Sequence, residues 1–402
     1  MKKILLFLFI LIMQSYSVLA ASSVVAIKEK EIVTIKLDEG HEVITLNKGE
    51  DFFHPQISEH KKWVAYQDMK SNLYLSNLSD NYDILFQIED VQSYTLTNDQ
   101  LIFSKTSGGI FLYDIRKKQV ITLIEPSKFI YDQLLINDEG LLFAQKYPLS
   151  ESKPLGLFEF DLNKNKESLI VDYIPISQQS FGMNPKPAKL SSNGKILYVW
   201  CEPSTASASM DGGPLGVYDV NKKKFKVLDQ TTMLSYLDNL AINSGTNDVV
   251  AIINGGWRFM NENKHLQLLN IESGSLEGVT EDNIASMTPS FSQDGTKLFY
   301  SAGLEVKGTY IGFALGHNHI YQYDLKTKET KQLTNNETGF DFYPQEIEND
   351  ELLFLRFNQD QSLCLVRRKT TGEETVLLSN LLTRNFEVYG HLESEQIVAI
   401  RY

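Results

Sequence analysis

From residue 32 onward the chain alternates between short runs of apolar and β-branched residues and short polar turns. Within the runs, apolar and polar side chains alternate with a period of two, as in residues 110–114 and 119–123. This pattern between turn residues predicts β-strands joined as hairpins. Long amphipathic helical patterns are absent, so the sequence predicts an all-β protein.

One phrase recurs along the chain: a lead-in that often ends in Pro, an alternating segment, a tight polar turn and an apolar strand. It is clearest from Thr288 to Tyr300, and further copies begin near Asn184 and His54. Repeats of roughly 40–55 residues with four strands each are typical of β-propeller blades. Degraded copies have turns near Asp99, Asp138, Gly245, Asp350 and Ser394.

The two ends of the chain each look like part of a repeat. The last copy, from Asn385 to Tyr402, is expected to supply the first two strands of a blade. Residues 32–37 and 42–46 look like the last two strands. Because exposed sheet edges promote aggregation, we expect these N- and C-terminal strands to pair and close the ring. The sequence thus predicts a β-propeller of eight blades of four antiparallel strands, with seven blades as the alternative.

The first twenty residues have the parts of a secretory signal peptide. A basic start is followed by an unbroken apolar run and then by small residues before Ala21. No Cys follows this cleavage site, which argues against a lipoprotein, and no other long apolar stretch predicts a membrane span. We therefore expect a signal peptide at 1–20, a single propeller domain at 21–402, and a periplasmic or secreted location.

Charge and cysteine content narrow the possible partners and the means of stabilisation. With 51 acidic and 38 basic residues the net charge is −13, which disfavours nucleic acid as a ligand. The only two cysteines, Cys201 and Cys364, fall three blades apart in the repeat register. We expect both to be buried free thiols, with a disulfide as the alternative, so the core must hold the domain together.

The phrase from Pro289 to Tyr300, with its trailing Lys331–Thr334, resembles the repeat of TolB-like β-propellers. The resemblance covers nearly all of the chain after residue 20 and is sharp in the copies near residues 55, 185 and 289. It implies an envelope or secreted location and a role in protein–protein contact. We expect a propeller alone, without the small α/β domain that precedes the propeller in TolB.

Related propellers also cap peptidases of the prolyl oligopeptidase type. Those enzymes need a hydrolase domain with a Gly-x-Ser-x-Gly nucleophile elbow. That pentapeptide does not occur in this sequence, which excludes this reading.

The long insertions all fall between the second and third strands of a blade, in four consecutive blades. They comprise residues 147–156, 202–216, 255–264 and 302–318. In a propeller these connections leave the same face as the connections between blades, so one side of one face should be built up. Long loops in a compact domain are commonly functional, although neutral variation in loop length would give the same pattern.

The candidate ligand-binding residues lie in these insertions or at the mouth of the axial funnel. Trp257 and Arg258 form an aromatic–Arg pair of the kind enriched at binding hot spots, although Trp257 could simply pack on a neighbouring blade. The other candidates are Asp211 in the Ser/Ala/Gly-rich insertion, Tyr310, His317 and His319 in the last insertion, and His54 and Tyr343 beside Pro in two inner-strand lead-ins.

His317 and His319 raise a weak possibility of a divalent metal. Their spacing would place both imidazoles on one side of a strand, but no third ligand has recognisable spacing. Ordinary polar loop histidines are the preferred interpretation of the pair, so no cofactor is predicted.

The preferred function is a protein- or peptide-binding module, expected to be a monomer, with an envelope or secreted protein as partner. The alternative is a secreted lyase or hydrolase acting on a glycan in the axial funnel. No catalytic motif supports an enzyme, although a propeller fold by itself does not exclude one.

Overall fold

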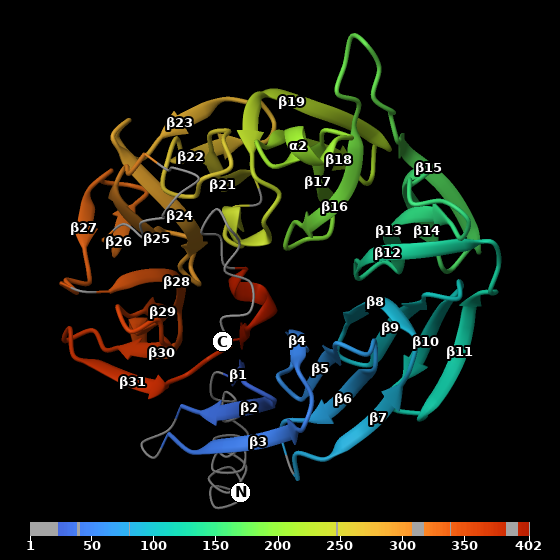
Figure 1. The fold of residues 1–402 in the computed structure, drawn as a ribbon, viewed down its shortest axis with the longest axis horizontal. Coiled ribbons are helices and arrows are strands. Elements are labelled where there is room, and N and C mark those ends of the chain that lie inside the picture. Colours follow the sequence, from blue (N-terminus) through green and yellow to red (C-terminus); the bar gives the residue numbers. More distant parts are fainter. Residues whose placement is uncertain are drawn as a thin grey trace, which may run out of the picture.

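The computed structural model describes residues 23–37, 41–79, 81–246, 248–307, 317–337, 339–382 and 393–401. The predicted signal peptide and Tyr310 lie outside these ranges. Eight sheets of four antiparallel strands stand around a central axis (Figure 1). The prediction of an eight-bladed propeller is therefore confirmed, and the seven-bladed alternative is wrong.

We number the blades 1–8 along the chain and letter the strands A to D from the axis outward. Blade 1 comprises β4 (Phe52–Ile57), β5 (Trp63–Asp68), β6 (Leu73–Asn77) and β7 (Ile84–Ile88). Blade 2 comprises β8 (Val91–Leu96), β9 (Gln100–Lys105), β10 (Ile110–Asp114) and β11 (Gln119–Ile124). Blade 3 comprises β12 (Phe129–Ile136), β13 (Leu141–Pro148), β14 (Gly156–Asp161) and β15 (Lys166–Asp172). Blade 4 comprises β16 (Asn184–Leu190), β17 (Ile196–Glu202), β18 (Gly213–Asp219) and β19 (Lys224–Met233).

The second half of the ring repeats the pattern. Blade 5 comprises β20 (Leu240–Ile242), β21 (Val249–Asn254), β22 (His265–Asn270) and β23 (Leu276–Gly278). Blade 6 comprises β24 (Ile284–Phe291), β25 (Lys297–Leu304), β26 (His319–Asp324) and β27 (Thr330–Gln332). Blade 7 comprises β28 (Phe340–Glu346), β29 (Leu352–Phe357), β30 (Leu363–Arg368) and β31 (Glu374–Leu378). Blade 8 comprises β32 (Val398–Arg401), β1 (Ser23–Lys28), β2 (Glu31–Lys36) and β3 (Val43–Lys48).

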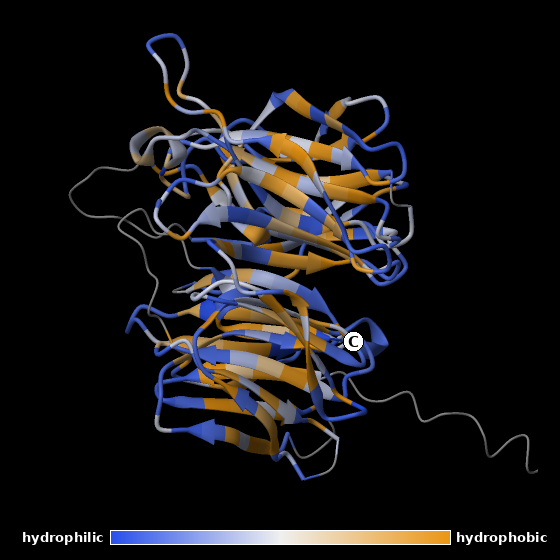
Figure 2. Ribbon diagram, turned by 90° about the vertical axis from the view of Figure 1, so that its right-hand side faces the viewer, coloured by the Kyte–Doolittle hydropathy of each residue, from blue (hydrophilic) through white to orange (hydrophobic). Residues whose placement is uncertain are grey.

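The burial of each strand follows from its place in the blade. The B strands are packed between neighbouring blades on both faces, so they bury runs of consecutive residues, as in the iBBBBi pattern (B buried, i intermediate) of β9. The D strands lie at the outer edge, and β11 is mostly exposed. Figure 2 shows the result, with apolar colour in the strand interiors and hydrophilic colour at the turns.

Blade 8 closes the ring with strands from both ends of the chain. The C-terminal β32 pairs with the N-terminal β1 over four register positions, from Ser23↔Arg401 to Ala26↔Val398. The sequence predicts that each end of the chain supplies two of the four strands of this blade, and the structure differs. The N-terminal segment supplies three strands, because Ser23–Lys28 turns through Lys30, at φ 56°, into β2. The segment near Ser394 is accordingly not an A–B turn, since it precedes the innermost strand.

The same kind of side-chain hydrogen bond connects neighbouring blades at four places in the ring. A side chain on strand B donates a hydrogen bond to a backbone carbonyl on strand A of the following blade, where both groups are buried. Satisfying these buried carbonyls fixes the angle between blades, because a carbonyl left without a donor is costly. The pairs are Gln67 to Val91, Ser104 to Tyr131, Gln145 to Pro185 and Ser301 to Asp341.

The aspartates that end the C strands have a structural explanation. Each carboxylate accepts hydrogen bonds from backbone N–H groups two or three residues later, which closes the C–D turn. These bonds, with a neighbouring Lys in several cases, lower the pKa of each carboxyl group. Four acidic residues therefore have a structural role in these turns: Asp114, Asp161, Asp219 and Asp324.

In the part of the chain that the structure describes, helical structure is confined to short segments: α2 (Ala206–Ser209) and the 3-10 turns η1 (Leu237–Asn239), η2 (Glu348–Asp350) and η3 (Ser394–Gln396). Among the described residues, no helix has the length and apolar character needed to cross a membrane. Cys201 and Cys364 are both buried and unbridged, as the sequence predicted.

Candidate functional site

The four long insertions lie where the sequence placed them, in the B–C connections of blades 3 to 6. Because the strands are antiparallel, the B–C and D–A connections share one face, which we call the rim face. The A–B and C–D turns share the opposite face, which we call the turn face. The described parts of the insertions, together with the D–A connection 173–183, form a continuous structure that we call the rim: residues 149–155, 173–183, 203–212, 255–264 and 305–307.

Backbone hydrogen bonds join each segment of the rim to the next. The N–H of Tyr173 donates to the carbonyl of Leu155 (3.0 Å), and the Ser204 N–H donates to the carbonyl of Phe181 (2.9 Å). Further on, the Trp257 N–H donates to the Asp211 carbonyl at 3.1 Å. The N–H of Val306 donates to the carbonyl of Asn261 at 3.0 Å. The rim is therefore one connected surface across four blades rather than a set of independent loops.

Three of the predicted site residues meet at the centre of the rim. The Arg258 guanidinium holds the Asp211 carboxylate through two hydrogen bonds, Nε to Oδ1 at 2.8 Å and Nη2 to Oδ2 at 2.7 Å. The same guanidinium lies 5.7 Å from the centre of the Trp257 ring. This pairing lowers the pKa of Asp211. The ion pair fixes the backbone beside Trp257, whose side chain remains 39% exposed, so the indole is presented to solvent from a rigid base.

The loop 255–264 is built around a buried lysine that the sequence did not single out. Lys264 is 2% exposed. Its Nζ donates to the carbonyls of Trp257 (2.7 Å), Glu262 (2.9 Å) and Gly256 (3.0 Å). Burial lowers the pKa of Lys264 to about 7, and nearby carboxylates, including Glu305, oppose that shift. A Lys in a polar loop carries no sequence signal for this role, because it depends on carbonyls that converge only in the fold.

The D–A connection 173–183 is the second feature that the sequence analysis missed. It leaves the ring as a narrow hairpin between β15 and β16 (Figure 1) and projects from the body of the molecule in the side view (Figure 2). Ile174 and Met183 pair at its base. The stretch from Tyr173 to Pro185 contains no charged residue, which is the signal that could have identified it in an acidic chain.

Exposed apolar side chains gather on the rim face. On this face they lie on the rim, at η1, at the end of β25 and in the loop after β5. The described residues of the A–B and C–D turns carry no exposed large apolar side chain, although Val43 and Ile84 are exposed where β3 and β7 begin, next to the turn face. The rim-face residues are Met69, Leu149, Leu155, Ile174, Ile176, Phe181, Leu237, Trp257 and Leu304.

His317 and His319 are not joined by a third metal ligand in the described part of the chain. His317 is exposed, while His319 is half-buried at the start of β26, and burial lowers the pKa of His319. The acidic neighbour of His319 is Asp341, whose carboxylate is held by two hydrogen bonds from Arg356, at 2.6 and 2.9 Å. Across the described ranges, no three His, Cys, Asp or Glu side chains are grouped so that they could hold a metal ion.

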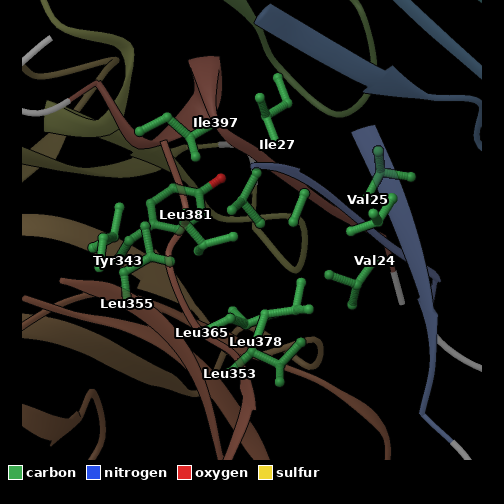
Figure 3. Packing of buried hydrophobic residues seen from close by; sticks show 14 of the residues in the cluster. Val24, Val25, Ile27, Tyr343, Leu353, Leu355, Leu365, Leu378, Leu381 and Ile397 are labelled. Carbon is green, nitrogen blue, oxygen red and sulfur yellow. The ribbon is translucent and has the colours of Figure 1, made fainter. Parts of the chain in front are cut away.

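His54 and Tyr343 do occupy equivalent positions, as the sequence predicted. Each has positive φ, 53° and 55°, at a bulge of an A strand and is followed by Pro. Their surroundings differ. Tyr343 is 9% exposed and packs with Leu381 and Ile397 (Figure 3), which favours simple packing, the alternative to lining the funnel mouth. Its neighbours come from the segment that follows β31 and precedes β32, which no repeat pattern could place.

His54, by contrast, remains accessible to solvent. The surrounding protein nevertheless lowers the pKa of His54 to about 4 by desolvation. With its pKa lowered in this way, the imidazole of His54 is neutral at pH 7.

The C-terminal segment occupies part of the axis. Ser394 on η3 donates a hydrogen bond from Oγ to Asp238 on η1 at 3.0 Å. Glu395 forms an ion pair with Lys189 of β16 at 2.8 Å, which links the C-terminal segment to blade 4. The expected axial funnel is therefore partly filled by the chain's own C-terminal segment.

Solved structures of other propellers resemble this fold. The dihydro-heme d1 dehydrogenase NirN, solved in complex with DHE, aligns with a TM-score of 0.60 at 11% identity, over 90% of this chain and 73% of NirN. BamB from Moraxella catarrhalis aligns with a TM-score of 0.52 at 13% identity, over 88% of this chain and 92% of BamB. TolB from Acinetobacter baumannii aligns with a TM-score of 0.41 at 14% identity, over 64% of this chain and 63% of TolB.

The similarities to NirN and BamB, together with the eight closed blades, make this chain a β-propeller. Identities this low show the fold alone. No protein-family model matches the chain, and no curated protein matches it in sequence.

Proposed function

We propose that this propeller is a protein- or peptide-binding module of the periplasm or the secreted fraction, and that the rim is its binding surface. The observation that carries the proposal is the gathering of exposed apolar side chains on the rim, among them Trp257, Ile176 and Phe181, whereas the described residues of the A–B and C–D turns carry none. Contiguous exposed apolar surface beside polar groups marks interaction sites in soluble proteins.

The construction of the rim supports a role in binding. Trp257 and Arg258 are residue types that dominate binding energy at protein interfaces, and here an ion pair to Asp211 holds them in place. A surface that is already ordered binds at a lower entropic cost than a flexible one. The TolB-like repeat implies the same kind of role.

An exported location is part of the same proposal. It rests on the basic start, apolar run and small residues of positions 1–20. The alternative of a glycan lyase or hydrolase stays an untested prediction, as do the monomeric state and the ligand-binding roles of Tyr310, His317 and His319.

A comparative pull-down from the exported fraction tests the proposal. We expect the triple substitution Ile176→Ser, Phe181→Ser and Trp257→Ser to reduce capture of a partner at least tenfold, because interface anchors each contribute on the order of 1–2 kcal/mol. All three side chains are exposed, at 52, 64 and 39%, so the fold should be retained.

The matched control removes three equally exposed apolar side chains from the outer D strands: Val120→Ser, Ile121→Ser and Val376→Ser, at 42, 39 and 53% exposure. Capture should be unchanged in this variant. Equal loss in both variants, or loss in the control alone, would contradict the assignment of the rim.

A further inference from the structure

Trp257, the exposed aromatic residue at the centre of the rim, has a backbone conformation that is unusual for its residue type. Its φ angle is 82°, in the left-handed region where the Cβ of an L-residue crowds its own backbone. For a bulky aromatic residue this conformation costs free energy, and it persists only where the surrounding contacts hold it. The contacts around Trp257 therefore decide whether its indole stays where a partner can reach it.

The loop that carries Trp257 is closed on itself and anchored in the fold. A Cβ added at Gly255, where φ is 133°, would collide with the carbonyl of Asn263 at the other end of the loop. Phe259 and Met260, in the middle of the loop, are 1% and 6% exposed. The loop thus buries its other large apolar side chains while Trp257 remains 39% exposed, so a local cause must hold the indole outward.

Lys264 joins the two ends of this loop through a single amino group. At the start of the loop, its Nζ donates to the carbonyls of Gly256 at 3.0 Å and Trp257 at 2.7 Å. At the end of the loop, it donates to the carbonyls of Glu262 at 2.9 Å and Asn263 at 3.5 Å. Because Lys264 is 2% exposed, removal of its side chain would take a donor away from carbonyls in a buried space, which is costly.

The peptide groups on both sides of the Trp257 Cα are held. The N–H of Trp257 donates to the carbonyl of Asp211 at 3.1 Å, and Asp211 is itself fixed by the ion pair with Arg258. The carbonyl of Trp257 accepts from Lys264. Since φ and ψ describe rotation of these two peptide groups about the Cα, fixing both of them fixes the backbone conformation of the residue.

We propose that Lys264 is the positioning residue of Trp257: its bond to the Trp257 carbonyl holds the strained backbone and so keeps the indole on the surface of the rim. Without this donor the following peptide group can rotate, φ relaxes to a negative value and the indole leaves its exposed position. The inference rests on the proposed function, because it names the residue that presents the central binding side chain to the partner.

Fluorine NMR of the protein labelled with 5-fluorotryptophan reports on Trp257 directly. The chain has three tryptophans, Trp63, Trp200 and Trp257, and the Trp257 resonance is the one that Trp257→Phe removes. Spectra are recorded at pH 6, below the Lys264 pKa of about 7, so that the amino group is mostly protonated. We expect Lys264→Met to shift the Trp257 resonance by more than its linewidth, or to split it, and to leave the other two resonances in place.

Two further variants keep this test decisive. Lys146→Met is the matched control, since Lys146 is 7% exposed and its Nζ contacts Glu167 in blade 3 at 2.5 Å, away from the loop 255–264. It should leave the Trp257 resonance unchanged. Lys264→Gln keeps two N–H donors, so its Trp257 resonance should lie between those of the wild type and Lys264→Met. An unchanged Trp257 resonance in the folded Lys264 variants, or an equal shift in Lys146→Met, would overturn the inference.

A double-mutant cycle in the pull-down separates this inference from the proposed function. Lys264→Met should reduce capture at least about threefold and have no further effect in the Trp257→Ser background, because it acts through that side chain. Independent losses that multiply in the double variant would contradict the positioning role. A shifted Trp257 resonance together with unchanged capture by Trp257→Ser would support the positioning of Trp257 and contradict the proposed function instead.

Discussion

At the residue scale, Lys264 couples the stability of the rim to pH. Its pKa is lowered to about 7 in the folded protein, against 10.5 for an ordinary lysine. Between these values the unfolded chain holds a proton that the folded chain has released. Stability therefore rises with pH across this window, by up to about 1.4 kcal/mol per pH unit, and is independent of this group below it.

The substitution Lys264→Met should remove that dependence. We expect the difference in unfolding free energy between the wild type and the variant to shift in favour of the wild type as the pH is raised from 7 to 9. Urea denaturation at several pH values measures it, and taking the difference cancels titrations that the two proteins share. A difference that stays constant with pH would show that Lys264 does not titrate in this window.

Sequence reasoning found some of these residues and missed others for a physical reason. Trp257 and Arg258 are unusual residues in a long loop, so they were visible in the sequence, and Asp211 proved to be their partner. Lys264 was not visible. Its importance comes from its burial and from the carbonyls of its own loop that converge on it in the fold, whereas a lysine in a polar loop is common.

At the scale of elements, the closing strand β32 is short yet protects a fully buried partner. Val24, Val25 and Ala26 of β1 are all 0% exposed. Deletion of residues 398–402 would turn β1 into an exposed inner edge and uncover these side chains. We expect a loss of several kcal/mol in stability, with aggregation through the free edge.

Calorimetry together with light scattering measures this effect. As a control, deletion of Tyr402 alone leaves all four pairs between β1 and β32 in place and should change little. Cooperative unfolding at the wild-type temperature after removal of 398–402 would mean that β32 is not needed for closure.

The strands also show which parts of the fold the sequence repeat could predict. Strands inside a repeat could be predicted because period-2 alternation and turn residues mark them. The first strand, Ser23–Lys28, was missed because it adjoins the predicted cleavage site and buries consecutive residues, so it does not alternate. The hairpin 173–183 was missed because inter-blade connections were treated as lead-ins.

At the scale of the whole molecule, the eight blades follow from the repeat, and the asymmetry of the ring follows from the positions of the insertions. What the sequence could not provide is the connection between insertions. The rim is one surface because backbone hydrogen bonds join segments from four blades, and such contacts between distant residues leave no local pattern. The partial filling of the axis by η3 likewise depends on contacts across the ring, such as Lys189 with Glu395.

The central claim is that a partner binds the rim face. Site-specific photo-crosslinking tests it most directly, with p-benzoylphenylalanine placed one position at a time in cells that export the protein. Phe181 and Trp257 report on the rim, and the equally exposed Val120 and Val376 report on the outer strands. We predict that both rim positions crosslink to the same protein and that neither outer position does. Crosslinks from the outer positions with none from the rim would contradict the claim.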